Sequence, residues 1–333
     1  MKKLSFIHRT PLILIILLMT IFLPGRLQAQ YIPVDSGFAE LLRGDVWTCV
    51  VNNQLDTNCA KNIQVPTNSG IEASPLIGHP AGYMCRSLEG LQYVGKNLEG
   101  SAVGTRNLSI SGLDSLRYVP ALPSIYNSVS ISNTPMLDTI GYWGDSVSSI
   151  DIIRSGIKAL PSFPLSLKSI LITFCDSLTS LPAFNNGLEI FRCGLSPIVS
   201  LPALPASLKE LWCQELPIIS LPALSNGLTS LRIENCSDLT SLSALPSTLN
   251  GIEVSSNGSL TSLPALPATL KRLFIPDNAL THLPELPDSM NFINCMRNQL
   301  TALPELQHTQ LTQLHCGYTL LPACRYYLAP LQL

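Results

Sequence analysis

The sequence predicts a repeat solenoid of the α/β class: a right-handed horseshoe with a parallel β-sheet on its concave face and little helix. Three observations predict it. An anchor leucine, usually followed by proline, recurs every 20 or 21 residues. A strand-like alternation of apolar residues precedes each anchor. The 333 residues include 26 prolines, which suit an extended return leg rather than a helical one. The anchors are Leu160, Leu181, Leu201, Leu221, Leu242, Leu263, Leu283 and Leu303.

The first 29 residues have the pattern of a secretory signal peptide. Lys2, Lys3 and Arg9 form a basic start, residues 11–24 are almost entirely apolar, and Leu27-Gln28-Ala29 resembles a cleavage site. The apolar run is shorter than the roughly 20 residues that span a bilayer, although an uncleaved anchor is the alternative. We therefore expect cleavage after Ala29 and a secreted, extracellular or cell-surface protein with no membrane span left.

The charge of the predicted mature chain argues against one class of partner. The signal peptide contains four of the 20 basic residues and none of the 22 acidic residues, so cleavage leaves 16 against 22, a formal charge of −6. A nucleic-acid-binding protein normally has a basic excess. We therefore expect no nucleic-acid partner.

Residues 30–105 lack the repeat and are expected to form an N-terminal cap, because the first core layer of a solenoid needs a cover. Residues 36–43 read as a short amphipathic helix with Asp35 or Ser36 as N-cap. Leu88–Val94 reads as a degenerate first turn. An independent domain is the alternative to a cap.

Residues 106–323 are expected to form about eleven repeats, each contributing one strand to the sheet. Each strand has two apolar residues separated by one other residue, so the pair points inward and its neighbours point out. Eleven strands about 4.8 Å apart give a sheet on the order of 50 Å long. The inward pairs are Leu108/Ile110, Val129/Ile131, Ile150/Ile152, Ile170/Ile172, Phe191/Cys193, Leu211/Cys213, Leu231/Ile233, Ile252/Val254, Leu273/Ile275, Ile293/Cys295 and Leu314/Cys316.

A column of small polar residues follows the strands, three positions after each inward pair. Such side chains can satisfy buried backbone groups in the turns. Leu113 and Leu216 interrupt the column and predict weaker turns. The return legs, such as Leu263–Pro267, are expected to be extended because their prolines fix φ and remove donors. The column contains Ser155, Cys175, Ser196, Cys236, Asn257, Asn278, Asn298 and Thr319.

Most of the ten cysteines are expected to be core residues rather than disulfide partners. Cys193, Cys213, Cys295 and Cys316 occupy a position that elsewhere contains Ile or Val, which indicates use as a small apolar side chain. Outside the repeats, Cys49–Cys59 is the pair most suited to a disulfide, but spacing leaves the pairing of Cys49, Cys59, Cys85 and Cys324 open.

The repeat, LxxLxxLxLxxNxLxxLPxLP, resembles the leucine-rich repeat, and its return leg resembles the bacterial LPX subclass found in YopM-type and IpaH-type effectors. The resemblance covers residues 106–323. Residues 31–94 are more faintly similar to the N-terminal caps of secreted bacterial leucine-rich-repeat proteins. The resemblance implies a non-enzymatic protein-binding solenoid. The departure is the export signal, which YopM-type and IpaH-type effectors lack in this form.

IpaH-type proteins add a ubiquitin-ligase domain with a Cys-x-Asp nucleophile motif, and this chain contains Cys236-Ser237-Asp238. Cys236 lies in the turn column, so we expect it to be buried and inert. Residues 324–333, a short C-terminal end, leave no room for a ligase domain. The sequence contains no phosphate-binding glycine loop or CxxC pair, and its histidines are scattered. We therefore predict no catalytic residue, metal or cofactor.

The candidate site is formed by outward-facing strand residues, which the repeat itself does not constrain. The early strands carry Asn107, Ser109, Ser128, Ser130 and Ser149 here. From the fifth strand onward Ile190, Glu210, Met296 and larger interface-type residues replace them. The predicted partner-binding residues are Arg192, Trp212, Gln214, Arg232, Glu234, Glu253, Arg272, Phe274, Phe292, Asn294 and His315, with Trp212, Arg232 and Phe274 at the centre.

We therefore expect a non-enzymatic scaffold that binds a host or surface protein through its concave face. Two other interpretations of the same residues stay open. Trp212 and Phe274 would also suit stacking on sugar rings, which is the carbohydrate-binding alternative. They would also suit packing against each other along the sheet. A ubiquitin-ligase-type effector is the remaining alternative, and it requires a reactive Cys236.

Overall fold

The computed structural model describes residues 31–33, 50–51, 54–56, 68–72, 88–89, 91, 106–306 and 309–320. The predicted signal peptide, the helix at residues 36–43, the Cys49–Cys59 pair and the short end at residues 324–333 lie outside this part of the chain.

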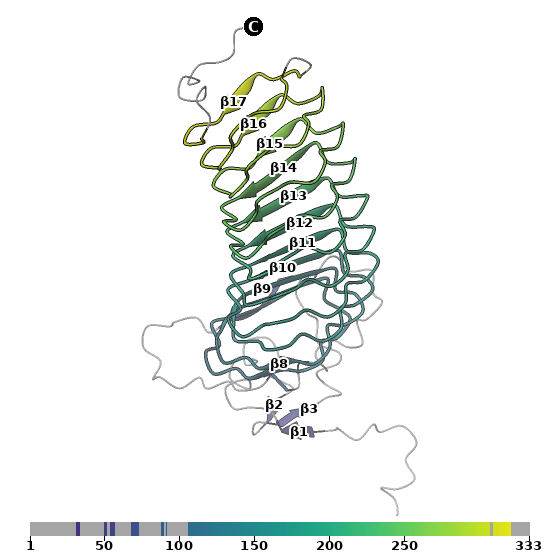
Figure 1. The fold of residues 1–333 in the computed structure, drawn as a ribbon. Coiled ribbons are helices and arrows are strands. Elements are labelled where there is room, and N and C mark those ends of the chain that lie inside the picture. Colours follow the sequence, from purple (N-terminus) through teal and green to yellow (C-terminus); the bar gives the residue numbers. More distant parts are fainter. Residues whose placement is uncertain are drawn as a thin grey trace, which may run out of the picture.

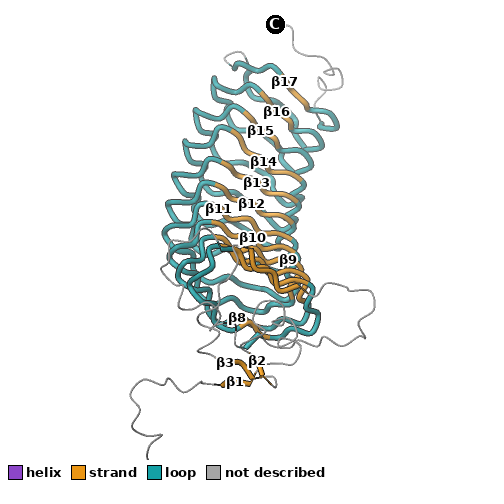
Figure 2. The backbone as a smooth tube through the Cα atoms, turned by 180° about the vertical axis from the view of Figure 1, so that it is seen from behind, coloured by secondary structure: helices purple, strands orange, loops and turns teal. Residues whose placement is uncertain are grey.

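The described repeats form one parallel sheet that coils into a curved solenoid (Figures 1 and 2). Sequential strands are neighbours, and consecutive turns are stacked along the axis. The described part of the sheet has 12 strands. They are β4 (Asn68–Glu72), β5 (Asn107–Ser111), β7 (Ser128–Thr134), β9 (Ser149–Ser155), β10 (Ser169–Thr173), β11 (Ile190–Gly194), β12 (Glu210–Gln214), β13 (Ser230–Glu234), β14 (Gly251–Ser255), β15 (Arg272–Phe274), β16 (Phe292–Asn294) and β17 (Gln313–His315).

Five short strands lie outside this sheet. β1 (Tyr31–Pro33), β2 (Val50–Val51) and β3 (Gln54–Asp56) form an antiparallel sheet of their own. β6 (Tyr118–Val119) and β8 (Thr139–Ile140) pair in parallel on the return legs of two early turns. The described residues contain no α-helix, and none of their segments is a helix long and apolar enough to cross a membrane.

The turn ahead of β5 begins earlier in the chain than the sequence pattern indicates. The sequence pattern places a degenerate first turn at Leu88–Val94. In the structure Leu88 and Leu91 are buried in the core, but the strand that pairs with β5 is β4, with Ile71 opposite Ile110. Asn68 and its partner Asn107 are 39 residues apart. This spacing is much longer than the repeat of 20 or 21 residues, so the repeat does not reveal β4.

The inward pairs form the core as predicted. The first ten pairs are buried, with at most 2% of any side chain exposed. At the last pair Cys316 is buried but Leu314 is only half-buried. The difference follows from position, because β17 has a described neighbour, β16, on one side only. The architecture is therefore the leucine-rich-repeat solenoid that the sequence predicts.

The polar column closes the turns, as expected. The Cys236 amide donates to Asn257 Oδ1 (2.9 Å), and the Asn257 amide donates to Asn278 Oδ1 (3.0 Å). The Asn278 and Asn298 amides in turn donate to backbone carbonyls, for example from Asn298 Nδ2 to Ile275 O (2.8 Å). Asn278 and Asn298 therefore satisfy backbone groups of their own turn and of a neighbouring turn.

A second column, one residue earlier in each turn, is not evident from the sequence. Its residues have left-handed backbone conformations, and all but Gly112 are non-glycine, with φ between 48° and 59°. Their amides extend the sheet ladder, as in Glu215 N to Glu234 O (2.9 Å). The non-glycine members are Asn133, Arg154, Phe174, Leu195, Glu215, Asn235, Ser256, Asp277, Arg297 and Tyr318.

The cysteines fulfil the prediction with one exception. Cys175, Cys193, Cys213, Cys236 and Cys295 are free thiols buried in the core. Cys316, expected to be another core thiol, is disulfide-bonded. It directly follows β17, the last described strand, and it is buried in the core as well as disulfide-bonded.

Candidate binding site on the concave sheet

The outward side chains form three rows that run across the strands on the concave face. We call them the leading, central and trailing rows, in the order in which the chain meets them along each strand. The leading row includes Ile190, Glu210, Ser230, Gly251, Arg272 and Phe292. The central row includes Asp151, Leu171, Arg192, Trp212, Arg232, Glu253, Phe274, Asn294 and His315, and the trailing row includes Gly194, Gln214, Glu234 and Ser255.

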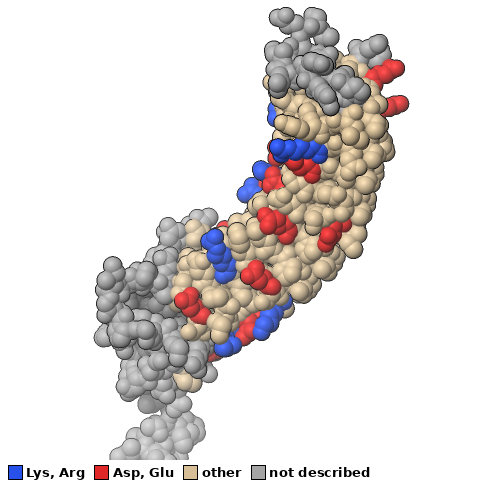
Figure 3. All heavy atoms as spheres, turned by 60° about the vertical axis from the view of Figure 1, so that its left-hand side comes forward, with Lys and Arg blue, Asp and Glu red and all other residues tan. Residues whose placement is uncertain are grey.

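The rows change character between the two halves of the sheet. In the N-terminal half they carry mainly serine, and neighbours such as Ser132 and Ser111 hydrogen-bond to each other (3.0 Å). Asp151 is a charged residue among them, and burial raises the pKa of its carboxyl group although Arg192 partly opposes the shift. On the face that Figure 3 shows, acidic and basic side chains stand singly or in small groups and form no large patch of one sign.

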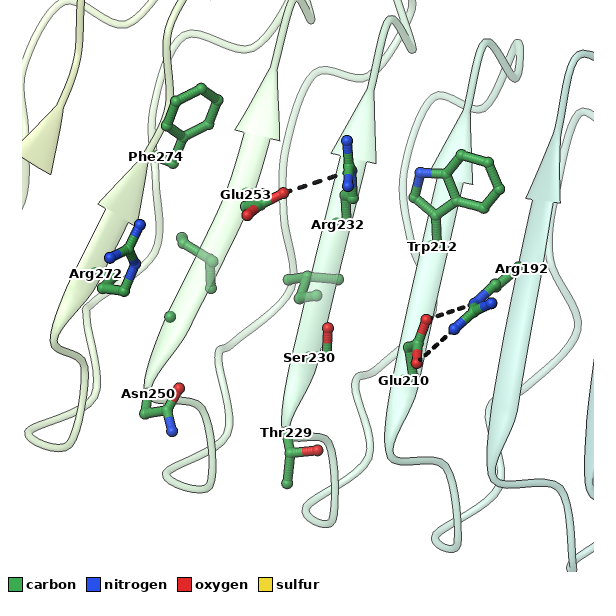
Figure 4. Close-up of a pocket in the computed structure, with 13 residues that line it drawn as sticks. Arg192, Glu210, Trp212, Thr229, Ser230, Arg232, Asn250, Glu253, Arg272 and Phe274 are labelled. Carbon is green, nitrogen blue, oxygen red and sulfur yellow. Dashed lines mark hydrogen bonds and ion pairs between the residues drawn. The ribbon is translucent and has the colours of Figure 1, made fainter.

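A hollow of about 550 Å³ lies in the C-terminal half of the sheet, over β11 to β15. Leu231 pairs with Ile252, which sets Ser230 beside Gly251 in the leading row. Ser230 and Gly251 form the floor because they have almost no side chain, whereas their neighbours in the row, Glu210 and Arg272, rise at either end (Figure 4). The hollow is lined by Arg192, Glu210, Trp212, Thr229, Ser230, Leu231, Arg232, Asn250, Gly251, Ile252, Glu253, Arg272 and Phe274.

Ion pairs hold two of the three arginines of the hollow. Arg192 meets Glu210 through two hydrogen bonds, from Nε to Oε1 (2.6 Å) and from Nη2 to Oε2 (3.2 Å). Arg232 contacts Glu234 at 2.7 Å and Glu253 at 3.5 Å. These bonds raise the pKa of both arginines. Exposed pairs of this kind add little stability, but they fix the direction of the side chains.

The third arginine is held differently. Arg272 is exposed and has no carboxylate within ion-pair distance among the residues that the structure describes. Its guanidinium lies over the Phe292 ring, 4.6 Å from the centroid. The Phe292 ring in turn lies 5.8 Å from that of His315. Arg272 therefore keeps an unpaired positive charge in an ordered position at one end of the hollow.

Trp212 and Phe274 lie at opposite ends of the hollow in the central row, with Arg232 and Glu253 between them (Figure 4). Two strands separate them, so packing of one ring on the other does not account for their presence. Both are half-buried. The Trp212 Nε1 is covered and has no hydrogen-bond acceptor in the described structure. The rings therefore contribute apolar surface to the hollow.

The structure brings together six of the eleven predicted residues: Arg192, Trp212, Arg232, Glu253, Arg272 and Phe274 all line the hollow. Glu234 supports it through Arg232, and Phe292 supports it through Arg272. Gln214, Asn294 and His315 lie on the same face outside the hollow.

The sequence did not lead us to the floor of the hollow, Ser230 and Gly251, or to Glu210, Thr229 and Asn250, which also line it. Glu210 was evident as an outward residue but is not an interface-enriched type, and Thr229 and Asn250 lie just before their strands. Ser230 and Gly251 matter because they lack bulk. The signal present in the sequence is that two successive small residues, Ser230 and Gly251, interrupt a row of larger outward residues.

The residues that suggested catalysis lie elsewhere. Cys236 is buried in the turn column, and burial raises the pKa of its thiol to about 11. Burial likewise raises the pKa of Cys175 to about 11 and that of Cys295 to about 12. Within the described ranges, the His, Cys, Asp and Glu side chains form no group that could hold a metal ion.

No protein-family model matches the chain, and no curated protein matches it. Among solved structures, the chain is similar to YopM from Yersinia enterocolitica WA-314, with 22% identity over 65% of each chain and a TM-score of 0.39. It is similar to YopM from Yersinia pestis, with 27% identity over 62% of this chain and 65% of that chain and a TM-score of 0.42. The leucine-rich-repeat domain of the type III effector XopL matches with 19% identity over 56% of this chain and 75% of that chain, at a TM-score of 0.37. The match thus spans 65% of the length of each YopM chain.

Proposed function

We propose that the protein is a non-enzymatic scaffold that binds another protein through the concave face of its solenoid after export from the cell. Repeat solenoids present extended concave surfaces that serve in binding. The observation that carries the proposal is the hollow between Arg192 and Phe274, which lies among outward residues that the fold does not require.

The composition of the hollow supports a macromolecular ligand over a small apolar one. Sites for small molecules are mostly apolar and deeply enclosed. This hollow is lined by three arginines, two glutamates and short polar side chains, with apolar surface from Trp212 and Phe274 at its ends. Arg and Trp are among the residues that contribute most to protein–protein affinity.

Export is supported by two independent features. The basic and apolar pattern before Ala29 is that of a signal peptide. The disulfide of Cys316 is a bond that persists in oxidising compartments and is rare in the cytosol. We place the mature protein outside the cytoplasm, secreted or at the cell surface.

The non-enzymatic assignment rests on the state of the one nucleophile that the sequence suggested. A reactive cysteine needs an accessible thiolate near neutral pH. Cys236 is 0% exposed and its pKa is raised to about 11. Its turn-column neighbour Asn257 accepts a hydrogen bond from its amide, so its role is structural.

The proposal is tested by filling the hollow without removing any of its larger side chains. Gly251→Tyr adds a ring over the floor, where even a Cβ would lie 3.3 Å from the Arg272 Cβ. Gly258→Tyr is the matched control, because a Cβ there meets nothing within 4 Å. Full-length protein, purified after export, is used to capture partners from host-cell and bacterial-surface extracts and is screened on a glycan array.

We expect a captured protein that wild type and Gly258→Tyr retain and Gly251→Tyr loses. A protein captured equally by all three would move binding away from the hollow. Glycan binding that is lost only in Gly251→Tyr would favour the carbohydrate alternative. Circular dichroism melting of all three proteins checks that the substitutions leave the fold intact.

A further inference from the structure

One of the three arginines of the hollow has no carboxylate partner among the described residues. Its lining contains Arg192, Arg232 and Arg272 but only two carboxylates, Glu210 and Glu253. Arg192 and Arg232 have carboxylate partners, whereas Arg272 has none within the described chain. The one arginine of the hollow without a carboxylate partner among the described residues is therefore at one end, on the strand that also carries Phe274.

The guanidinium of Arg272 is also held in a position that favours the binding of an anion. Stacking on Phe292 restricts its guanidinium before any ligand arrives, which lowers the entropic cost of binding. The guanidinium retains its hydrogen-bond donors while it stacks, and these match the two oxygens of a carboxylate. Gly251 beside it leaves the sheet open to a ligand.

The spacing of the hollow matches an extended peptide that crosses the strands. Trp212 lies on β12, whereas Arg272 and Phe274 lie on β15, three strands further on. Three strand steps of about 4.8 Å give about 14 Å. Four residues of an extended chain also cover about 14 Å, and residues i, i+2 and i+4 face the same side. The side chain at i+2 then lies over Ser230 and Gly251.

From these observations, which rest on the proposed function, we propose that the hollow binds an extended acidic peptide segment of the partner protein. An aspartate or glutamate of the segment pairs with Arg272. An apolar side chain four residues away in the segment lies against Trp212. The residue midway between them occupies the floor at Ser230 and Gly251.

A library of random linear peptides displayed on phage tests this proposal. Full-length wild-type protein should select peptides with an aspartate or glutamate four residues from an aromatic or aliphatic residue. Arg272→Glu should weaken binding of a selected synthetic peptide about tenfold or more, as expected for loss of a charge-assisted pair. In the phage selection, the Arg272→Glu variant should instead select peptides with lysine or arginine in place of the acidic residue and with the same apolar residue.

Arg154→Glu is the matched control. Arg154 is likewise an exposed arginine stacked on a phenylalanine, 4.8 Å from the Phe174 centroid, but it does not line the hollow. It should select the same acidic peptides as wild type. Equal weakening by Arg154→Glu and Arg272→Glu would overturn the proposal, because it would indicate only a general effect of charge.

The outcomes separate this proposal from the function on which it rests. Peptides or partners that are lost in Gly251→Tyr but show no acidic preference would overturn the acidic segment and keep the binding hollow. If Gly251→Tyr still binds the selected acidic peptides, both the acidic-segment proposal and the proposed binding function of the hollow are overturned. An acidic oligosaccharide that binds where no peptide does would replace the peptide with a glycan.

Discussion

Two adjacent residues with different requirements close each turn of the solenoid. The first, such as Asp277, has a left-handed backbone conformation that costs a non-glycine residue about 1–2 kcal/mol. The second, such as Asn278, satisfies backbone groups that would otherwise be buried without partners. The hydrogen bonds of the second residue and of the sheet ladder offset the strain at the first.

Asn278→Ala should lower the free energy of unfolding by about 1–3 kcal/mol, because buried backbone groups lose their partner. Asn278 accepts from the Asn257 amide and donates to Val254 O (2.7 Å). Chemical denaturation measures the loss. Asn278→Ser should lose less, because Ser196 performs a similar role in its turn, where it accepts from the Cys175 amide and donates to Gly194 O. Equal losses for Ala and Ser would contradict a hydrogen-bonding role.

The sequence revealed the polar column but not the column of left-handed residues that precedes it. Asn257, Asn278 and Asn298 share a side chain because the buried amide contacts require it. The left-handed position accepts residues as different as Leu195 and Asp277, because the ladder of hydrogen bonds imposes its backbone. The floor of the hollow was missed for a related reason, since Ser230 and Gly251 act through the bulk they lack.

At the scale of elements, each repeat strand contributes two inward side chains to the core, where they pack against the inward side chains of the neighbouring strands. The period of the sequence therefore predicted strands β5, β7 and β9 to β17 and their inward faces correctly. β4 could not be found this way, because a single turn of irregular length carries no internal repeat to compare with.

Leu273→Ala should lower the free energy of unfolding by about 2–5 kcal/mol, because its fully buried side chain leaves a cavity between β14 and β16. The equivalent change in the last described strand, Leu314→Ala in β17, should cost clearly less, since that side chain is only half-buried. Guanidinium denaturation of both variants beside wild type measures the difference. Equal losses for the two variants would contradict the half-buried position of Leu314 in β17.

At the scale of the whole molecule, the solenoid is a one-dimensional array in which each turn contacts only its neighbours. Stability is expected to be lowest where a turn has a neighbour on one side only. Among the described strands β17 is in that position, and the disulfide of Cys316 follows it directly. The sequence predicted the array, but a disulfide at one repeat position could not be told from a core thiol.

Reduction with dithiothreitol should therefore increase hydrogen exchange at β17 and β16 and leave β11 to β13 protected, because Cys316 directly follows β17 and each turn contacts only its neighbours. Hydrogen–deuterium exchange with mass spectrometry, with and without reductant, measures this. Cys295→Ala is the control for a buried free thiol nearby and should respond to the reductant as wild type does. A uniform loss of protection along all strands would show that the array opens as one unit.

The hollow exists because the leading row has two successive small residues, Ser230 and Gly251, not because the chain bends or inserts a loop. Leading-row residues contribute nothing to the core pairs, so replacing a large residue with a small one there leaves the folding of the turn untouched. One such exchange moves the depression by one strand, about 4.8 Å along the axis. A lineage with this architecture can therefore relocate its recognition surface by single substitutions, and different copies of one scaffold can diverge in specificity without passing through an unstable intermediate.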